Sequence, residues 1–395
     1  MAKVKDIAMQ IRGVSYHPED LRNTLDDDSI VLLRANNIKD GKLLLDDVVY
    51  VSKSKVAKQQ YLQTGDILIC ASSGSKELVG KAAFVDSVKN PMTFGAFCKV
   101  VRPQPEYSEY LGHYFNSPVY RRKISALSAG ANINNIKNEH IDNLDIQLVD
   151  EKERREIITI LNELNMLISL RKQQLFKLDE LVKAQFVEMF GDPINNPMKW
   201  IVSKIEDIAA QEKNALKAGP FGSALKKEFY VKSGYKIYGQ EQVICGDASF
   251  GDYYIDEEKY KELKNCAVQA GDILISLVGT YGKTLIMPDN YEAGIINPRL
   301  IKITLNKNKV TPIYFKYYFE SDALKASMDA NTHGGTMGIL NLGIIRQMKI
   351  QVPPLSIQNQ FAAFAERVDQ QKQTVQQSLE KLELMKKALM QEYFG

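Results

Sequence analysis

The chain has 395 residues, of which 45% are apolar and 25% are charged, as in a folded globular protein of two or three domains. This composition excludes a disordered or collagen-like chain, and no segment approaches the run of about 18 apolar residues that spans a membrane. The chain has 51 Lys and Arg and 48 Asp and Glu, so its net charge is only +3. This charge neither requires nor excludes nucleic-acid binding, which would depend on local basic patches.

The cysteines and histidines show no pattern of a disulfide framework or a metal site. The cysteines form no Cys-x-x-Cys pair, and no two histidines have a metal-ligand spacing on one helix: Cys70, Cys98, Cys245, Cys266, His17, His113, His140 and His333. The N-terminal residues lack the apolar core of a signal peptide. We expect a cytoplasmic protein with free thiols, no metal and no membrane association.

The first region, residues 1–150, is predicted to be mixed α/β. Short β-rich runs at 30–33, 48–51, 66–70 and 97–101 alternate with turn clusters, and a helix is expected at 109–127. Residues 198–352 have the same character, with a helix at 312–328. The aromatic row of that helix is expected to belong to a core rather than to a base-stacking platform: Tyr314, Tyr317 and Tyr318.

Each of these regions is followed by a long amphipathic helix. In residues 151–189, apolar side chains alternate at spacings of three and four: Ile157, Leu161, Leu164, Ile168, Leu175, Leu178 and Val182. Gly191 and Pro193 then end the helix. Residues 356–393 repeat the pattern with Phe361, Ala365, Val368, Val375, Leu379, Leu382 and Leu389.

One such helix cannot bury its apolar stripe alone. Two in one chain are expected to pack antiparallel, and a coiled coil with another protein is the alternative. Each stripe has one polar position near its middle, Arg171 in the first and Lys372 in the second.

The two halves of the chain are copies of one another. Tyr110, Phe115 and Phe190 recur as Tyr314, Phe319 and Phe394, at a constant offset of 204 residues. The Gly-Asp-Ile-Leu-Ile segment at 65–69 recurs at 271–275, where the offset has drifted to 206. Each copy is thus a variable module followed by a nearly constant helical module.

We therefore predict an α+β fold with an internal twofold repeat. Two mixed α/β domains, at residues 1–150 and 192–352, are separated by two long antiparallel coiled-coil helices within the spacers 151–191 and 353–395.

No catalytic constellation is visible in the sequence. Leu277 stands where a phosphate-binding loop ending at Gly282 and Lys283 needs a glycine. The Asn-Pro-Pro-aromatic motif of amino-methyltransferases is missing, and no Ser/His/Asp set is apparent. The sequence therefore predicts a chain without its own enzymatic activity.

Polar and basic loops of the two α/β domains are candidate DNA contacts. Glycine allows close backbone approach, hydroxyls can read base edges and lysine neutralises phosphate. Taken singly, each such loop is more often a solvated loop than a DNA contact, and the recurrence of the same basic loop in both copies raises DNA binding to an equal alternative. The candidates are Ser72, Ser73, Ser75, Lys76, Lys81, Arg121, Arg122, Lys123, Lys217, Ser223, Lys226, Lys227, Thr280, Tyr281 and Lys283. In the helices, the candidate partner-binding seam comprises Leu161, Leu164, Ile168, Leu175, Leu178, Val368, Val375, Leu379 and Leu382.

Several motifs resemble those of one family. They are FGDPxxNPxxW at 190–200, GPFGSxLK at 219–226, GDILI with a downstream Gly-Lys in each half, and the segment 350–355 that enters the last helix. Together they resemble the specificity (S) subunit of a Type I restriction-modification system over essentially the whole chain. The first half lacks GPFGS, and Val149, Asp150 and Glu151 stand where the second half has Pro353, Pro354 and Leu355.

The resemblance implies a sequence-specific DNA-binding subunit with two target recognition domains, each of which reads one half of a gapped double-stranded DNA site. It also implies methyltransferase (M) subunits, two in number, on the helices, and a restriction (R) subunit that can join. S-adenosylmethionine, ATP and Mg²⁺ would then belong to the partners, with methylation at adenine N6, and this chain would hold no cofactor.

The recognition modules have diverged more than the helical modules, as expected if they read different sequences while contacting identical partners. The half-sites should therefore differ. Two alternatives remain: a self-contained DNA-modifying enzyme or its fragment, and a helical scaffold that carries two ligand-binding domains and binds no DNA.

Overall fold

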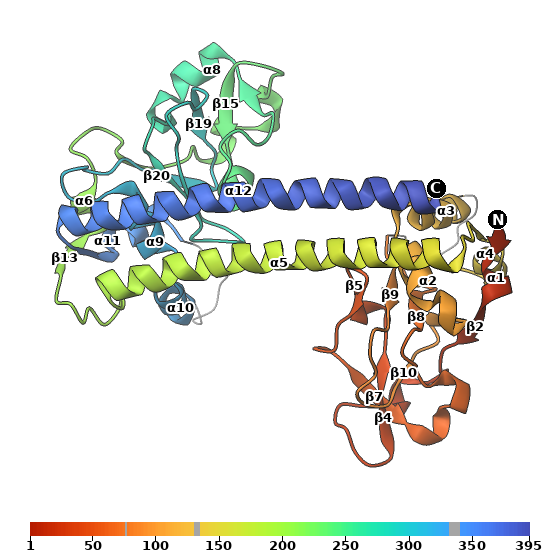
Figure 1. Ribbon diagram of the computed structural model, residues 1–395. Coiled ribbons are helices and arrows are strands. Elements are labelled where there is room, and N and C mark those ends of the chain that lie inside the picture. The colour runs from red at the N-terminus through yellow and green to blue at the C-terminus, as the bar shows by residue number, and fades with distance from the viewer. Residues whose placement is uncertain (76, 130–134, 332–339) are drawn as a thin grey trace. The chain divides into compact units, whose positions relative to one another are not determined.

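The computed structural model describes residues 1–75, 77–129, 135–331 and 340–395 (Figure 1). Lys76, one of the candidate DNA contacts, lies outside the described residues. The chain forms two compact units: unit 1 comprises Met1–Lys172 and Gln376–Gly395, and unit 2 comprises Gln173–Val375.

Unit 1 contains the first α/β domain. Its elements are β1 (Ala2–Lys3), α1 (Val4–Ile7), β2 (Ala8–Arg12), β3 (Leu21–Arg22), β4 (Ser29–Leu33), β5 (Ile38–Lys39), β6 (Lys42–Leu43), β7 (Val49–Ser52), β8 (Ile67–Cys70), β9 (Ala82–Phe84), β10 (Met92–Phe94), β11 (Cys98–Pro103), α2 (Ser108–Phe115), α3 (Pro118–Ala129), α4 (Asn138–Asp142) and β12 (Asp145–Ile146). Helix α5 (Glu151–Phe190) begins in this unit and ends in unit 2.

Unit 2 follows a similar order, with two additional short helices, at 240–245 and 257–262, that have no counterpart among the described helices of unit 1. Its elements are β13 (Ile201–Lys204), α6 (Ile205–Ile208), β14 (Leu216–Ala218), β15 (Tyr235–Tyr238), α7 (Gln240–Cys245), β16 (Tyr254–Ile255), α8 (Glu257–Glu262), β17 (Ile273–Ser276), β18 (Thr284–Ile286), β19 (Gly294–Ile296), β20 (Leu300–Ile303), α9 (Pro312–Phe319), α10 (Asp322–Asn331), α11 (Leu342–Gln347) and β21 (Lys349–Val352). Helix α12 (Leu355–Phe394) begins here and ends in unit 1.

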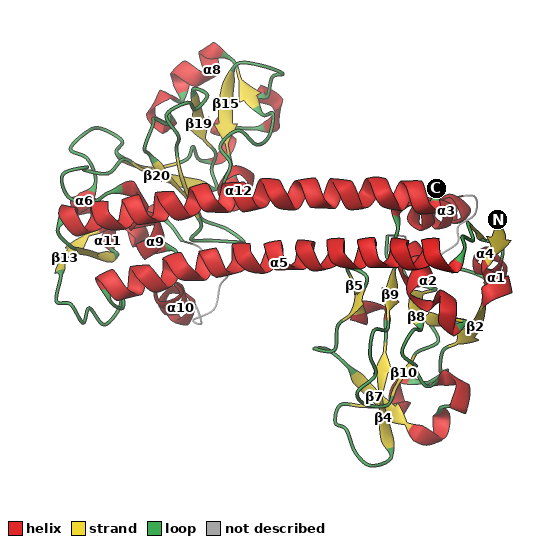
Figure 2. Ribbon diagram, viewed as in Figure 1, coloured by secondary structure: helices red, strands yellow, loops and turns green. Residues whose placement is uncertain are grey.

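Each unit contains strands and short helices beside the long helices (Figure 2), and one sheet of each unit has the same strand order. A four-stranded sheet has the order β2-β11-β8-β9 in unit 1 and β14-β20-β17-β18 in unit 2, with antiparallel pairing throughout. In the second sheet, β4 pairs with β10 in parallel, as β15 does with β19. The repeat seen in the sequence is therefore a repeat of the fold, and the α+β class is confirmed.

In unit 1, the core is closed by the beginning of one long helix and the end of the other. Ile157 and Leu161 of α5 share a buried cluster with Met390 and Phe394 of α12, so the two helices run antiparallel within this unit. The Phe394 ring lies 5.1 Å from that of Tyr110, in an edge-on contact. The apolar stripe of each helix is thus buried against an α/β domain as well as against its partner helix.

Unit 2 is closed in the same way with the roles of the helices exchanged. Phe186 and Phe190 near the end of α5 pack on Phe361 near the start of α12, with ring centroids 5.4 and 5.5 Å apart. Tyr314 joins this cluster at 4.7 Å from Phe190, as expected of an aromatic row that belongs to a core.

Most of the predicted helix seam is buried. The buried members are Leu161, Leu164, Ile168, Val368, Val375 and Leu379, and the partly buried members are Leu175, Leu178 and Leu382. At the polar position in unit 2, the Lys372 ammonium lies 2.6 Å from the Asp179 carboxylate, so the break is filled by an ion pair across the two helices. None of the helices in the described ranges has the combination of length and apolarity that a membrane crossing requires.

The short helices that follow the sheets differ from the sequence prediction. Each expected helix is two: α2 and α3 in unit 1, and α9 and α10 in unit 2. In unit 1 the break falls at Ser117, whose hydroxyl donates to the Tyr114 carbonyl (2.6 Å), and Pro118 begins the next helix. Proline has no N–H to continue a helix and suits its first turn, so α3 starts anew at this residue.

The FGDPxxNPxxW motif builds the turn from α5 into β13. The Trp200 indole donates to the Phe190 carbonyl (3.0 Å), and the Asn196 amide both accepts from the Trp200 N–H and donates to the Trp200 carbonyl. Gly191 has a φ of +79°, and a side chain there would meet the Pro197 ring. The most distinctive motif of the sequence is therefore a structural one.

The contact between domain and helices differs between the units at one equivalent position. Tyr317 of unit 2 packs edge-on against Phe361 at 5.2 Å. Its counterpart in unit 1 is His113, which is buried in a more polar setting, with Asn162 of α5 beside it. Burial lowers the pKa of His113 to about 4 from an ordinary value of 6.5.

Removal of the Phe361 ring should destabilise unit 2. Phe361 is fully buried, so we expect Phe361→Ala to lower the free energy of unfolding by about 3–5 kcal/mol. The matched control is Phe176→Ala on α5, where the ring is 64% exposed and a change within about 0.5 kcal/mol is expected. Urea denaturation of the full chain measures both, and equal losses would contradict the packing described here.

Unit 1 should lose stability as His113 becomes protonated. Its folded pKa lies below its unfolded pKa, so the stability that depends on a neutral ring is complete above pH 6.5 and falls as the pH drops toward 4. Between pH 7 and 5 this amounts to about 2 kcal/mol. In urea denaturation at both values, His113→Gln should lose less stability than the natural chain, and an identical pH dependence in the two proteins would refute this role.

Candidate nucleic-acid interface

In unit 1, several loops meet at one end of the four-stranded sheet. Strands β2 and β8 end there, and β9 and β11 begin there, because Cys98 pairs with Cys70, Lys99 with Arg12, and Ile69 with Ala82. The segment after β2, the described residues of the loop 71–81 (71–75 and 77–81) and the turn 95–98 therefore emerge together. We call this end of the sheet the loop end.

Unit 2 has the equivalent loop end. Ala218 pairs with Ile301, Ser276 with Leu300, and Ile275 with Thr284, which brings together the segment after β14, the loop 277–283 and the turn 297–300. The two turns correspond, since the N–H of Cys98 donates to the Gly95 carbonyl (2.8 Å) as that of Leu300 does to Asn297 (3.1 Å).

Each turn is pressed against a glycine. A methyl group on Gly13 would lie 2.1 Å from the Gly95 carbonyl oxygen, and one on Gly219 would lie 1.9 Å from that of Asn297. No side chain fits at either position. This contact explains why glycine opens the GPFGS segment, and it makes Gly13 its counterpart in the first half, where the motif was not recognised.

The loop end of unit 1 contains four of the sequence-predicted contacts. Ser72, Ser73, Ser75 and Lys81 lie in the loop 71–81, and the Lys81 side chain is exposed. Arg121 lies on α3 and supports the same loop, because its guanidinium donates to the Val79 carbonyl at 2.9 Å.

Two further candidates from α3 have structural partners instead. The Arg122 guanidinium contacts the Gln391 side chain, and the Lys123 ammonium donates to the Asp145 carbonyl (3.1 Å). The basic cluster 121–123 is thus divided among three different environments within unit 1.

The candidates of unit 2 lie in three segments. Thr280, Tyr281 and Lys283 belong to the loop 277–283, where the Lys283 ammonium lies 3.5 Å from the Glu320 carboxylate. Lys217 is in β14. Ser223, Lys226 and Lys227 follow Gly219, and all three are exposed.

The comparison with known families decides between the alternatives left open by the sequence. The sequence model of the Type I restriction modification DNA specificity domain matches residues 3–180 and 197–384, once in each half. The chain belongs to this family. It is a DNA specificity subunit of a Type I restriction-modification system, the non-catalytic component that guides methylation and restriction by partner subunits.

Individual relatives of this specificity subunit agree with the assignment. The Type I restriction enzyme EcoKI specificity subunit of Escherichia coli is 30% identical over 94% of this chain and 83% of its own. The fold is shared with the S subunit of a Type I system from M. genitalium (TM-score 0.53, 13% identity, 100% and 95% coverage). It is also shared with a chain from a structure titled for complex assembly and conformational transition of the type I R-M system (TM-score 0.60, 15% identity, 99% and 96% coverage).

Sequence reasoning missed the purpose of the aspartate in each GDILI segment of the specificity subunit. Asp66 is completely buried and accepts two hydrogen bonds from the Arg102 guanidinium, at 2.7 and 2.8 Å. In unit 2, Asp272 is equally buried and lies 3.2 Å from the Lys302 ammonium. Each aspartate ties its strand to the neighbouring β11 or β20, so the motif recurs because it holds the sheet together.

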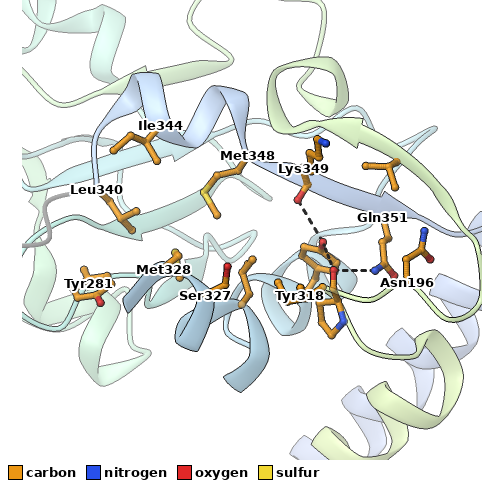
Figure 3. Close-up of a pocket in the computed structure, with 14 residues that line it drawn as sticks. Asn196, Tyr281, Tyr318, Ser327, Met328, Leu340, Ile344, Met348, Lys349 and Gln351 are labelled. Atoms are coloured by element: carbon orange, nitrogen blue, oxygen red, sulfur yellow. Dashed lines mark hydrogen bonds between the residues drawn. The ribbon is translucent and has the colours of Figure 1, made fainter. Parts of the chain in front are cut away.

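A pocket of about 650 Å³ lies in unit 2, beside the FGDPxxNPxxW turn. Figure 3 shows the Tyr318 hydroxyl and the Gln351 amide converging on one point, and both donate to the Pro193 carbonyl, at 3.2 and 2.9 Å. The described side chains that line the pocket include no carboxylate, imidazole or thiol. Its described titratable side chains are Tyr281, Tyr318 and Lys349.

Metal-ligand clusters and reactive thiols are the other features that bear on the chemistry of the specificity subunit. In the described ranges, no three His, Cys, Asp or Glu side chains gather in a way that could hold a metal ion. Cys70, Cys98 and Cys266 are buried, and burial raises the pKa of each of these thiols. High thiol pKa values make them poor nucleophiles at neutral pH.

Lys226 and Lys227 are predicted to contact DNA phosphates. Replacing both by Ala should weaken binding of the assembled complex about equally for all DNA sequences, and the log–log salt slope should fall by about one per lysine. The control is Lys307→Ala, since Lys307 follows β20 and lies beyond the opposite end of the sheet. A changed sequence preference with an unchanged slope would show that the two lysines do not bind phosphate.

Proposed function

We propose that this specificity subunit reads an asymmetric bipartite DNA site, with the loop end of each unit recognising one half, and directs methylation of adenine N6 by two methyltransferase subunits. The observation that carries the proposal is the pair of topologically equivalent loop ends. One fold is used twice, and each copy presents its own set of side chains.

The corresponding loops of the two loop ends differ in length and in side chains, as expected if the two half-sites differ. In unit 1, the loop 71–81 joins β8 to β9 and carries the hydroxyls of Ser72, Ser73 and Ser75. Unit 2 has the shorter loop 277–283, with Thr280 and Tyr281. Such side chains can donate to and accept from base edges in the major groove, and their arrangement decides which bases are read.

An exposed apolar face of α5 is the argument for the binding of partner subunits. Within unit 1, Ile160, Leu167 and Leu170 of α5 are 39, 40 and 51% exposed and lie outside the buried seam. Their spacings of seven and three residues place them along one face of the helix. We infer that helices of a methyltransferase subunit cover this face, and that α5 and α12 act as the spacer between the recognition domains.

The chemistry resides in the partners under this proposal. Methyltransferase subunits would bring S-adenosylmethionine, and restriction subunits would bring ATP and Mg²⁺. The net charge of +3 is small for a chain that binds DNA alone, so partner subunits are expected to supply much of the positive surface.

Methylation should depend on this chain and on a partner. We expect genome-wide adenine methylation at one bipartite motif in cells that express the chain with its methyltransferase subunit, and none at that motif when the chain is deleted. The purified chain alone, incubated with plasmid and labelled S-adenosylmethionine, should transfer no label. Transfer without a partner, or a motif that persists after deletion, would refute the proposal.

A further inference from the structure

In unit 1, a phenylalanine ring stands in solvent at the loop end. Phe97 is 65% exposed, although it lies directly before the buried start of β11. Its backbone is fixed, because the Phe97 carbonyl accepts from the N–H groups of Ala71 (2.9 Å) and Ser72 (3.0 Å). The fold thus fixes the backbone of a residue whose apolar ring stands in water, and the ring belongs to none of the three buried clusters of the unit.

The loop end of unit 2 also presents a phenylalanine. Phe221 is 84% exposed and follows Gly219 and Pro220, which are both buried. Proline fixes its own φ, and the Phe221 carbonyl accepts from the Ala224 N–H at 3.2 Å. This ring, too, has a defined backbone and no place in the core.

The two rings come from different loops of the same architecture. Phe97 occupies the third position of the turn 95–98, and the corresponding position of the turn 297–300 is Arg299, which is exposed. Phe221 is two residues after the glycine that touches the turn, and the equivalent residue of unit 1 is Ser15, also exposed. Each unit therefore places one exposed phenylalanine at its loop end, from a position that is polar in the other unit.

The surroundings of the rings are polar and basic. Phe97 shares its loop end with the hydroxyls of Ser72, Ser73 and Ser75 and with Lys81. Phe221 shares its own with Ser223, Arg299 and the loop 277–283, in which Val278 is the one apolar side chain that is largely exposed. An exposed phenylalanine ring among mostly polar and basic side chains differs from the contiguous apolar patch that marks a protein-docking surface. It matches the chemistry of nucleobases, which combine polar edges with apolar ring faces and, in thymine, a methyl group.

We propose that Phe97 and Phe221 are specificity-determining residues, each of which packs its ring against a nucleobase of the half-site read by its own unit. The ring supplies apolar contact with a base face or a thymine methyl group, while neighbouring hydroxyls and cations bind base edges and phosphates. Because the rings project from different loops, they meet different positions of the two half-sites. This inference rests on the function proposed above.

Methylome sequencing of single variants tests the inference. In cells with the cognate methyltransferase subunit, Phe97→Ala should relax one half of the motif by about tenfold in base preference and leave the other half as in the natural chain. Phe221→Ala should relax only the opposite half. Phe97→Leu and Phe221→Leu, which keep an apolar side chain, should retain more of the preference than the alanine variants.

Phe176→Ala is the matched control, because its ring on α5 is 64% exposed, about as much as that of Phe97. It should change neither half-site. All three alanine variants should keep the thermal midpoint of the natural complex, since no buried contact is lost.

Binding by the purified complex provides the second measurement. On DNA that contains the bipartite motif, the Phe97→Ala and Phe221→Ala complexes should each bind about tenfold more weakly than the natural complex. Their affinity for random DNA and the salt slope should be unchanged, since no phosphate contact is removed. Replacing thymine by uracil in the affected half-site should reproduce this loss in the natural complex if the ring meets a methyl group. No effect of that replacement would assign the ring to a base face.

Two results would overturn the inference. Unchanged half-sites in both alanine variants would show that the rings read no base. Failure of a variant to assemble with the methyltransferase subunit would show that the ring docks a protein. Either result leaves the bipartite motif of the natural chain in place, so it is distinguishable from failure of the proposed function, in which the motif does not depend on the chain.

Discussion

The structure depends on the burial of the apolar stripes of two long amphipathic helices. Each helix has 40 residues and an apolar stripe, and each unit uses the start of one and the end of the other. Phe186, Phe190 and Phe361 make this closure in unit 2, and Phe394 makes it in unit 1. In each unit, the α/β domain completes the burial by packing on both helices, and its loop end is therefore held by this packing.

Elements with a strong periodic signal were predictable from the sequence. The helix predicted at 151–189 is α5, and that at 356–393 is α12, because a three-four alternation over so many residues leaves no other means of burial. The repeat also predicted the common topology. The shorter helices were predicted less well, since the break at Ser117 and Pro118 depends on local hydrogen bonding that periodicity does not reveal.

The interface was only partly predictable because loop residues are brought together by strand pairing. Sequence reasoning chose basic and hydroxyl-bearing residues, yet Lys123 and Arg122 have structural partners, while Phe97 was assigned to a β-rich run and not to the interface. Its signal is exposure, which becomes visible only when Cys98 is paired with Cys70 in the sheet. The equivalence of Gly13 and Gly219 likewise depends on the fold. A Cβ atom at either position would lie about 2 Å from a neighbouring carbonyl oxygen, and this steric restriction cannot be recognised from the amino-acid sequence.

The burial of Phe394 has a consequence for the order in which the chain can fold. The core of unit 1 includes Met390 and Phe394, and these residues are synthesised after every residue of unit 2. A ribosome that has made the first α/β domain has therefore not yet made the helix end that seals it. During translation, Tyr110 and Tyr114 therefore lack their contact with the Phe394 ring until the last residues are made. The unit that is synthesised first is thus the one whose core is completed last.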